Sequence, residues 1–200
     1  KFWRKALHVS SSWIGLVYIY AGIPHPLTVV ILGSLTLVFL GIDLVRYLNP
    51  GFAAFCNRTF SGLFIERDRN RPNSATWYLV SVFLVVLFFG GETRLERLAA
   101  GIPVLLLAWG DTAASVFGKL YGRRRMPLLK GTWIGFLACV GAAMLVMLCF
   151  QLLEPALPGW WWLVPAAGLL TALAEALPLP LDDNLTIVLL TGIFLHLCLS

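Results

Sequence analysis

A short stretch from Trp109 to Arg125 contains the residue types that phosphate chemistry requires. On a continuous helix, five of its residues fall at offsets of 0, 4, 7, 8 and 11 and share one face: Asp111, Ser115, Gly118, Lys119 and Gly122. A carboxylate can hold a divalent cation, a lysine can bind anionic oxygens, and glycines let a ligand approach the backbone closely. The stretch therefore predicts a site for a phosphate-bearing ligand and a metal.

Membrane orientation offers a plainer interpretation of part of this stretch. A helix that ends at a membrane surface commonly carries snorkelling cations, and a cluster such as Arg123 to Arg125 usually sets the orientation of the chain. Orientation does not explain Asp111, because a carboxylate near hydrocarbon depth is costly to keep. We therefore expect Asp111 to be functional.

The composition is that of a polytopic membrane protein. The 200 residues are 59% hydrophobic and only 12% charged, with eight tryptophans and a mean hydropathy of +0.84. The net charge of +5 does not indicate nucleic-acid binding, because the cations lie in loops between apolar segments. The four cysteines lack the spacing of a metal site and are expected to be packing residues. We expect one transmembrane catalytic domain over residues 1–200.

The fold predicted from hydropathy is all-α, with about seven transmembrane helices. Crossing about 30 Å of hydrocarbon takes about 20 helical residues, or fewer where flanking side chains snorkel. The expected spans are 9–21, 27–48, 76–89, 95–120, 133–152, 160–177 and 185–200. Asn49-Pro50-Gly51 ends the second span and a long polar loop to Ser74 follows, whereas Asp182 to Asn184 should cap the last helix.

Lysine and arginine are distributed unevenly over the loops. They concentrate in the N-terminal lead-in, in the loop after the second span and in the loop after the fourth, which places these segments in the cytoplasm. Alternation then puts the acidic loop around Asp183 on the same side. The polar clusters should therefore meet at the cytoplasmic face, which in a prokaryote is the inner face of the plasma membrane.

Two further clusters have structural as well as functional interpretations. In the lead-in, Arg4, Lys5 and His8 are spaced to form a polar stripe, which suits either an interfacial anchor or a reactive face with His8 as proton acceptor. Asp43 and Arg46 are three residues apart and are most simply an ion pair within one helix.

Three motifs resemble the polyprenol kinase family, which includes dolichol kinase, phytol kinase and CTP-dependent diacylglycerol kinase. They are Arg4-Lys-Ala-Leu-His8, the segment Gly110 to Gly122, and Glu175-Ala-Leu-Pro178 followed by Asp183-Asn-Leu-Thr-Ile187. The resemblance spans nearly the whole chain, with the motifs in the family's order. It implies transfer of the γ-phosphate of CTP to the hydroxyl of a membrane lipid alcohol, with a divalent metal, expected to be Mg²⁺.

The resemblance also implies roles for individual residues. Arg4, Lys5, His8 and Asp111 would be catalytic, and Asp111 and Asp183 would hold the metal. The nucleotide would contact a larger group: Ser115, Gly118, Lys119, Gly122, Arg123, Lys130, Thr132 and Asn184. One departure stands out, because Lys130-Gly-Thr-Trp-Ile-Gly135 has Ile134 where the family has an acid, which argues against a metal role for this loop.

Two other functions stay open from the residues alone. A CTP-dependent cytidylyltransferase that makes a CDP-lipid is the nearest alternative, and it would release pyrophosphate where a kinase releases CDP. A transporter is the alternative from another class, but it should carry polar residues near the midplane and an internal repeat. The chain length of the lipid alcohol, the metal, and the choice between monomer and homodimer are not fixed by the sequence.

Overall fold

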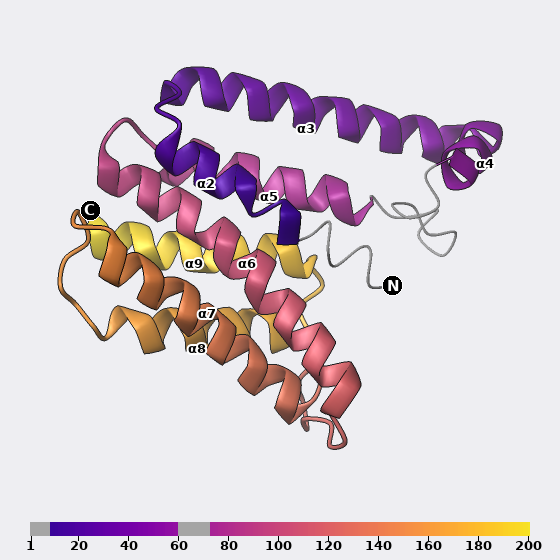
Figure 1. Cartoon of the computed structure of the whole chain (residues 1–200). Helices are drawn as coiled ribbons and strands as arrows, with labels where there is room; N and C mark the ends of the chain where they lie inside the picture. The colour runs from indigo at the N-terminus through magenta and orange to yellow at the C-terminus, as the bar shows by residue number, and fades with distance from the viewer. Residues whose placement is uncertain (1–8, 60–72) are drawn as a thin grey trace.

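The computed structural model describes residues 9–59 and 73–200, and the regular elements in these ranges are α-helices (Figure 1). The helices are α2 (Trp13–Tyr20), α3 (His25–Leu48), α4 (Pro50–Thr59), α5 (Ser74–Phe89), α6 (Arg94–Tyr121), α7 (Trp133–Leu153), α8 (Leu163–Ala176) and α9 (Asp183–Leu199). The all-α prediction is confirmed, and every expected span coincides with a helix. Within the described ranges, α3, α6 and α7 are long and apolar enough to cross a membrane, whereas α5, α8 and α9 are apolar but shorter. The number of crossings stays a prediction.

Helix α6 is the central element of the bundle, and it contacts α2, α5, α7, α8 and α9. It begins at a capping box, in which Thr93 Oγ1 accepts a hydrogen bond from the Glu96 amide and the Glu96 carboxylate accepts one from the Thr93 amide. It runs without a break through the buried Pro103 to Tyr121. Asp111, Ser115, Gly118 and Lys119 therefore lie on the last turns of the most buried long helix, and Gly122 and Arg123 follow its end.

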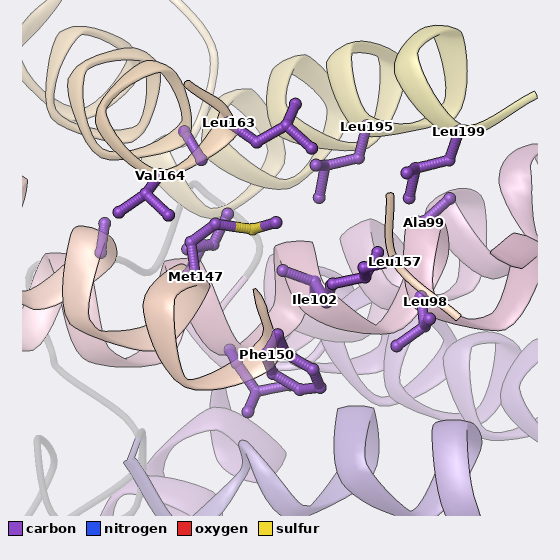
Figure 2. Close-up of a cluster of buried hydrophobic side chains, with 14 of the residues drawn as sticks. Leu98, Ala99, Ile102, Met147, Phe150, Leu157, Leu163, Val164, Leu195 and Leu199 are labelled. Atoms are coloured by element: carbon purple, nitrogen blue, oxygen red, sulfur yellow. The ribbon is translucent and has the colours of Figure 1, made fainter. Parts of the chain in front are cut away.

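The core lies where α6, α7, α8 and α9 meet (Figure 2). Leu98 and Ile102 of α6 pack with Met147 of α7, Leu163 of α8 and Leu195 of α9, and all five side chains are fully buried. Apolar side chains gain little from leaving lipid for protein, so close van der Waals packing must hold these helices together. This packing fixes the axis of α6 relative to its neighbours.

Near the candidate site, α6 and α7 approach each other through glycines. A Cβ atom on Gly135 would lie 2.8 Å from the Ala114 carbonyl oxygen, and one on Gly118 would lie 3.2 Å from Thr132 Oγ1. Contacts this close are possible only without side chains, as in the small-residue interfaces of membrane helices. The close packing of α6 against α7 thus favours glycine at position 118 whether or not a ligand binds there.

Helix α4 was not expected, since Asn49-Pro50-Gly51 was interpreted as the start of a loop. The chain does leave α3 there, but Pro50 is the first residue of the next helix. Proline fits this position because its missing N–H would have no partner in the first turn. The Asn49 Oδ1 accepts hydrogen bonds from the amides of Gly51 and Phe52, at 2.9 and 3.1 Å, and so caps α4.

The ends of the helices divide into two groups, as the predicted alternation requires. The loops 21–24, 90–93 and 154–162 lie at the end of the bundle where the C-terminus is found, and the loops 122–132 and 177–182 lie at the other end (Figure 1). We call these the outer and inner ends, after the predicted orientation.

The outer end is closed by buried and half-buried ion pairs. Arg94 forms two hydrogen bonds with the Glu154 carboxylate, one of them from Nε at 3.1 Å, and donates to the Ile19 carbonyl at 2.6 Å. Arg97 pairs with Glu92 at 2.9 Å and also donates to backbone carbonyls of the α2–α3 segment. The hydrogen bonds from Arg94 lower the pKa of Glu154. These contacts fasten α2, α6 and α7 to one another.

Candidate active site

A cavity of about 620 Å³ opens at the inner end, between the last turns of α6, the following loop and the start of α7. Five of the residues predicted to contact the nucleotide line it together: Ser115, Gly118, Lys119, Lys130 and Thr132. Residues from the end of α6 and from the loop before α7 thus meet around one space. Apart from Glu175, the polar side chains of the lining are basic or hydroxyl-bearing, which suits a ligand with phosphate groups.

Two hydroxyls beside Asp111 lack hydrogen-bond partners within the described residues. Thr112 Oγ1 and Ser115 Oγ are both buried, and Ser115 lines the cavity. Buried hydroxyls in proteins nearly always have a partner, so an unpaired one calls for a water molecule, an ion or a ligand. The Ser115 hydroxyl therefore supports a polar occupant of this cavity.

The loop from Gly122 to Thr132 is held in place from three directions. The Lys130 amide donates to the Ala176 carbonyl of α8 at 2.7 Å, and Lys130 Nζ pairs with Asp183 Oδ1 of α9 at 2.8 Å. Arg125 and Thr132 form a single antiparallel β-bridge across the loop, and Thr132 Oγ1 caps α7 by accepting from the Gly135 amide at 3.2 Å. Lys130 and Thr132 are thereby fixed beside the end of α6.

The acidic residues gather on the side of α6 that faces the start of α9. Burial raises the pKa of Asp182, the Asn184 amide lowers it, and the negative charges of Asp183 and Asp111 raise it further. Asp182 caps α9 by accepting from the Asn184 amide at 3.0 Å, as expected. The negative charge of Asp111 thus acts on Asp182 at the start of α9, and the joint metal site of Asp111 and Asp183 stays a prediction.

These groups fit a Mg²⁺ ion that is shared with a nucleotide. The described residues contain no group of three or more His, Cys, Asp or Glu side chains that could hold a metal alone. Kinase Mg²⁺ sites need only one or two carboxylates, because phosphate oxygens and water supply the other ligands. Asp111, with the unpaired hydroxyl of Ser115 one turn away, offers the oxygen donors that this ion prefers.

Other predicted site residues lie elsewhere. Asn184 is 7% exposed, and its amide donates to the Ser74 carbonyl and hydroxyl, each at 3.4 Å, so it sits between α9 and α5. Gly122 and Arg123 line a neighbouring groove. The lead-in residues Arg4, Lys5 and His8 lie outside the described residues, and their predicted roles stay predictions.

No individual role in the site was predicted for two charged residues that line the cavity, Glu175 and Arg125. Glu175 comes from the end of α8, and its position in the cavity depends on the packing of α8 beside α6 and α7. The only sequence signal was its place in the Glu175-Ala-Leu-Pro178 motif. Arg125 was grouped with its two neighbouring arginines, although it faces a different space from them.

An apolar helical bundle with basic and hydroxyl-bearing side chains around a cavity at one end suits a membrane enzyme that acts on a phosphate-bearing ligand. Similar proteins have names that agree with this class. The chain is 28% identical to CTP-dependent diacylglycerol kinase 1 of Schizosaccharomyces pombe, over 97% of this chain and 91% of the relative. It is 26% identical to the protein of the same name from Saccharomyces cerevisiae, over 96% of this chain and 71% of the relative.

A bacterial relative extends the comparison to another lipid alcohol. The phytol kinase of Synechocystis is 27% identical over 74% of this chain and 57% of its own length. No family model matches the chain, and no solved structure matches it either. The resemblance to the polyprenol kinase family is confirmed, since the diacylglycerol kinases align with nearly the whole chain and the phytol kinase with 74% of it, and their names support a lipid kinase.

Proposed function

We propose that this protein transfers the γ-phosphate of CTP to the hydroxyl of a membrane lipid alcohol, such as diacylglycerol or an isoprenoid alcohol, at the cytoplasmic face. The observation that carries the proposal is the cavity at the inner end, which Ser115, Lys119 and Lys130 line, with Ser115 one helical turn from Asp111. The names of the relatives support CTP as the donor and a lipid hydroxyl as the acceptor. A lipid alcohol presents its hydroxyl at headgroup depth and a nucleotide reaches the membrane from the cytoplasm, so the two can meet only at such a site.

In this proposal, the cations of the cavity bind the triphosphate. Lys119 is exposed at the end of α6 and faces the cavity, so its ammonium can bind phosphate oxygens. Lys130 is positioned by its ion pair with Asp183 and binds from the opposite wall. The Ser115 hydroxyl donates to a phosphate oxygen and so gains the partner that it lacks.

A divalent ion on Asp111, with Asp183 nearby, would offset the charge that develops on the phosphates. The ion pair between Asp183 and Lys130 links the proposed metal side of the site to the proposed nucleotide side. Asp182 caps α9 and so positions Asp183 beside Lys130, which lines the cavity.

Chemically, the lipid hydroxyl oxygen forms a bond to the γ-phosphorus while the bond from this phosphorus to the β–γ bridging oxygen breaks. CDP leaves, and the proton of the alcohol passes to a base. His8 is the base that the sequence suggests, and it lies outside the described residues. The in-line geometry and the surrounding cations supply most of the rate enhancement in such reactions.

Product analysis tests the reaction class. Purified protein in lipid nanodiscs is incubated with radiolabelled CTP, diacylglycerol or phytol, and Mg²⁺. We expect CDP and a lipid phosphate, and pyrophosphate with a CDP-lipid would instead establish the cytidylyltransferase. No product with any lipid alcohol and nucleotide would refute both enzymes.

Two substitutions test the site. Asp111→Asn should abolish turnover while the protein stays folded, because the amide keeps the shape of the side chain but loses the charge. Lys119→Ala should raise the KM for CTP as well as lower kcat, because this cation also binds the ground state. Arg58→Ala is the matched control, since Arg58 is an exposed cation of α4 outside the cavity. Rates like wild type for Asp111→Asn would overturn the assignment.

A further inference from the structure

A second hollow lies beside the proposed nucleotide cavity and shares no lining residue with it. It is a groove of about 760 Å³, lined by Leu120, Tyr121, Gly122, Arg123, Arg124, Trp133 and Ile134. The strand-like pieces around the Arg125–Thr132 bridge separate the two spaces, and the Trp133 amide donates to the Arg124 carbonyl at 3.3 Å across this wall. The wall is therefore a single layer of backbone.

The groove combines a cationic rim with an apolar wall. Arg123 and Arg124 are exposed and form no ion pair with another described residue, and no acidic residue lines the groove. Trp133 is 50% exposed and Ile134 is 40% exposed, although both begin an apolar helix. Paired guanidinium groups beside an open apolar surface suit a molecule with a phosphate at one end and a hydrocarbon chain at the other.

The position of the groove along the membrane normal suits such a molecule. It lies at the inner end, where α6 and α7 reach the predicted headgroup region, and Trp133 and Tyr121 are the aromatic residues that favour this depth. The apolar side chains that continue down α7, including the 62% exposed Leu137, provide a track for an acyl chain. Ile134 suits this track better than the acid that the related motif has, because a carboxylate would repel a phosphate.

We propose that this groove binds a lipid phosphate monoester, with its phosphate on Arg123 and Arg124 and its hydrocarbon chain along Trp133 and Ile134. The choice of a monoester rests on the proposed function, since a lipid phosphate is the product that the adjacent cavity would release. The doubly charged phosphate distinguishes it from the phosphodiester lipids of the surrounding bilayer. The absence of an acidic lining residue favours this dianion over the neutral substrate.

Fluorescence quenching tests the inference without any turnover. The full chain is placed in phosphatidylcholine nanodiscs that contain an acyl-chain spin label on phosphatidic acid, phosphatidylglycerol or phosphatidylcholine, with no nucleotide present. The difference in fluorescence between wild type and Trp133→Phe isolates the signal of Trp133 from that of the other tryptophans. We expect an apparent affinity for phosphatidic acid about tenfold above that for phosphatidylglycerol, the effect of one more charge-assisted hydrogen bond.

The double variant Arg123→Gln/Arg124→Gln should remove this preference, whereas Arg58→Gln, a control on an exposed arginine of α4, should keep it. Equal quenching by phosphatidic acid and phosphatidylglycerol in wild type would overturn the inference, as would a preference that survives in the double variant. The test is separate from catalysis. If the protein is an active kinase but binds phosphatidic acid no better than phosphatidylglycerol, only the proposed lipid phosphate site is refuted. If it prefers phosphatidic acid but makes no product, only the proposed function is refuted.

Discussion

Adding one methyl group at Gly135 should distort the candidate site by separating two helices. A Cβ at this position would lie 2.8 Å from the Ala114 carbonyl oxygen, and an ordinary contact needs at least 3.4 Å. The Cβ atom is attached directly to the α7 backbone and the carbonyl oxygen belongs to the α6 backbone, so neither atom can rotate away. Helices α6 and α7 must therefore separate by about 0.6 Å. Ala114 is adjacent to Ser115, and Gly135 itself lines the cavity, so the separation occurs within the site.

The expected cost has two parts. Overpacking of a tight contact destabilises proteins by about 1–3 kcal/mol, and alanine in a helix recovers about 1 kcal/mol relative to glycine. We therefore expect Gly135→Ala to lose up to about 2 kcal/mol in the free energy of unfolding. The effect on rate should be larger, since a misplacement of about 1 Å at a reacting centre can cost on the order of 100-fold. Unfolding is followed by circular dichroism in detergent, and turnover by the product assay.

Gly141→Ala provides the matched control in the same helix, because a Cβ there meets nothing within 4 Å. This variant should be at least as stable as wild type and keep its turnover. If Gly135→Ala behaves like Gly141→Ala in both assays, the close crossing of α6 and α7 does not set the geometry of the cavity, and the reasoning fails.

Three further predictions concern the framework. Glu154→Gln should reduce the free energy of unfolding by about 1–2 kcal/mol. Because Arg94 lowers the pKa of Glu154, the stability that this carboxylate contributes is present above the ordinary pKa of 4.5 and is lost as the pH falls through the lowered pKa. The unfolding temperatures of variant and wild type should therefore converge in acid. Asp43→Asn should cost about 3 kcal/mol in a detergent unfolding assay, because it removes the ion pair between Asp43 and the buried Arg46 and weakens the contacts that join α3 to α5. In a cysteine-free background, Arg124→Cys should react with a membrane-impermeant thiol reagent only from the cytoplasmic side and Gly159→Cys only from the other, and labelling of both from one side would contradict the topology.

The helices could largely be predicted because each depends on local signals. Apolar runs and their flanking turns located α3 to within two residues and α6 to within one residue at each end, including the uninterrupted passage through Trp109 to Tyr121. Helix α4 was missed for a local reason as well. Pro50 is a breaker for the helix before it and a favourable first residue for the helix after it, and the sequence alone does not say which role applies.

Helical spacing alone could predict the candidate site only along one helix, and the roles of Lys130 and Thr132, which also line the cavity, came from the family resemblance. The shared face of Asp111, Ser115 and Lys119 follows from helical spacing, and Ser115 and Lys119 do line one cavity. The pairing of Lys130 with Asp183 joins residues 53 positions apart, and no spacing rule connects them. Arg123 and Arg125 are two residues apart and still line different hollows, because a single layer of loop backbone divides the two spaces. Such separations depend on tertiary packing.

The ion pairs at the outer end determine where the bundle can move. Arg94 and Arg97 bind carbonyls of the α2–α3 segment and carboxylates of two other loops, so the helices share a fixed pivot there. Helix α6 is 28 residues long and therefore spans about 42 Å, so a tilt of about 5° around that pivot displaces its far end by nearly 4 Å. A small tilt at the ion pairs is thus amplified at the cavity, where the close packing of α6 against α7 at Gly118 and Gly135 limits it. Both ends of α6 must therefore be held for Lys119 to keep its place in the cavity.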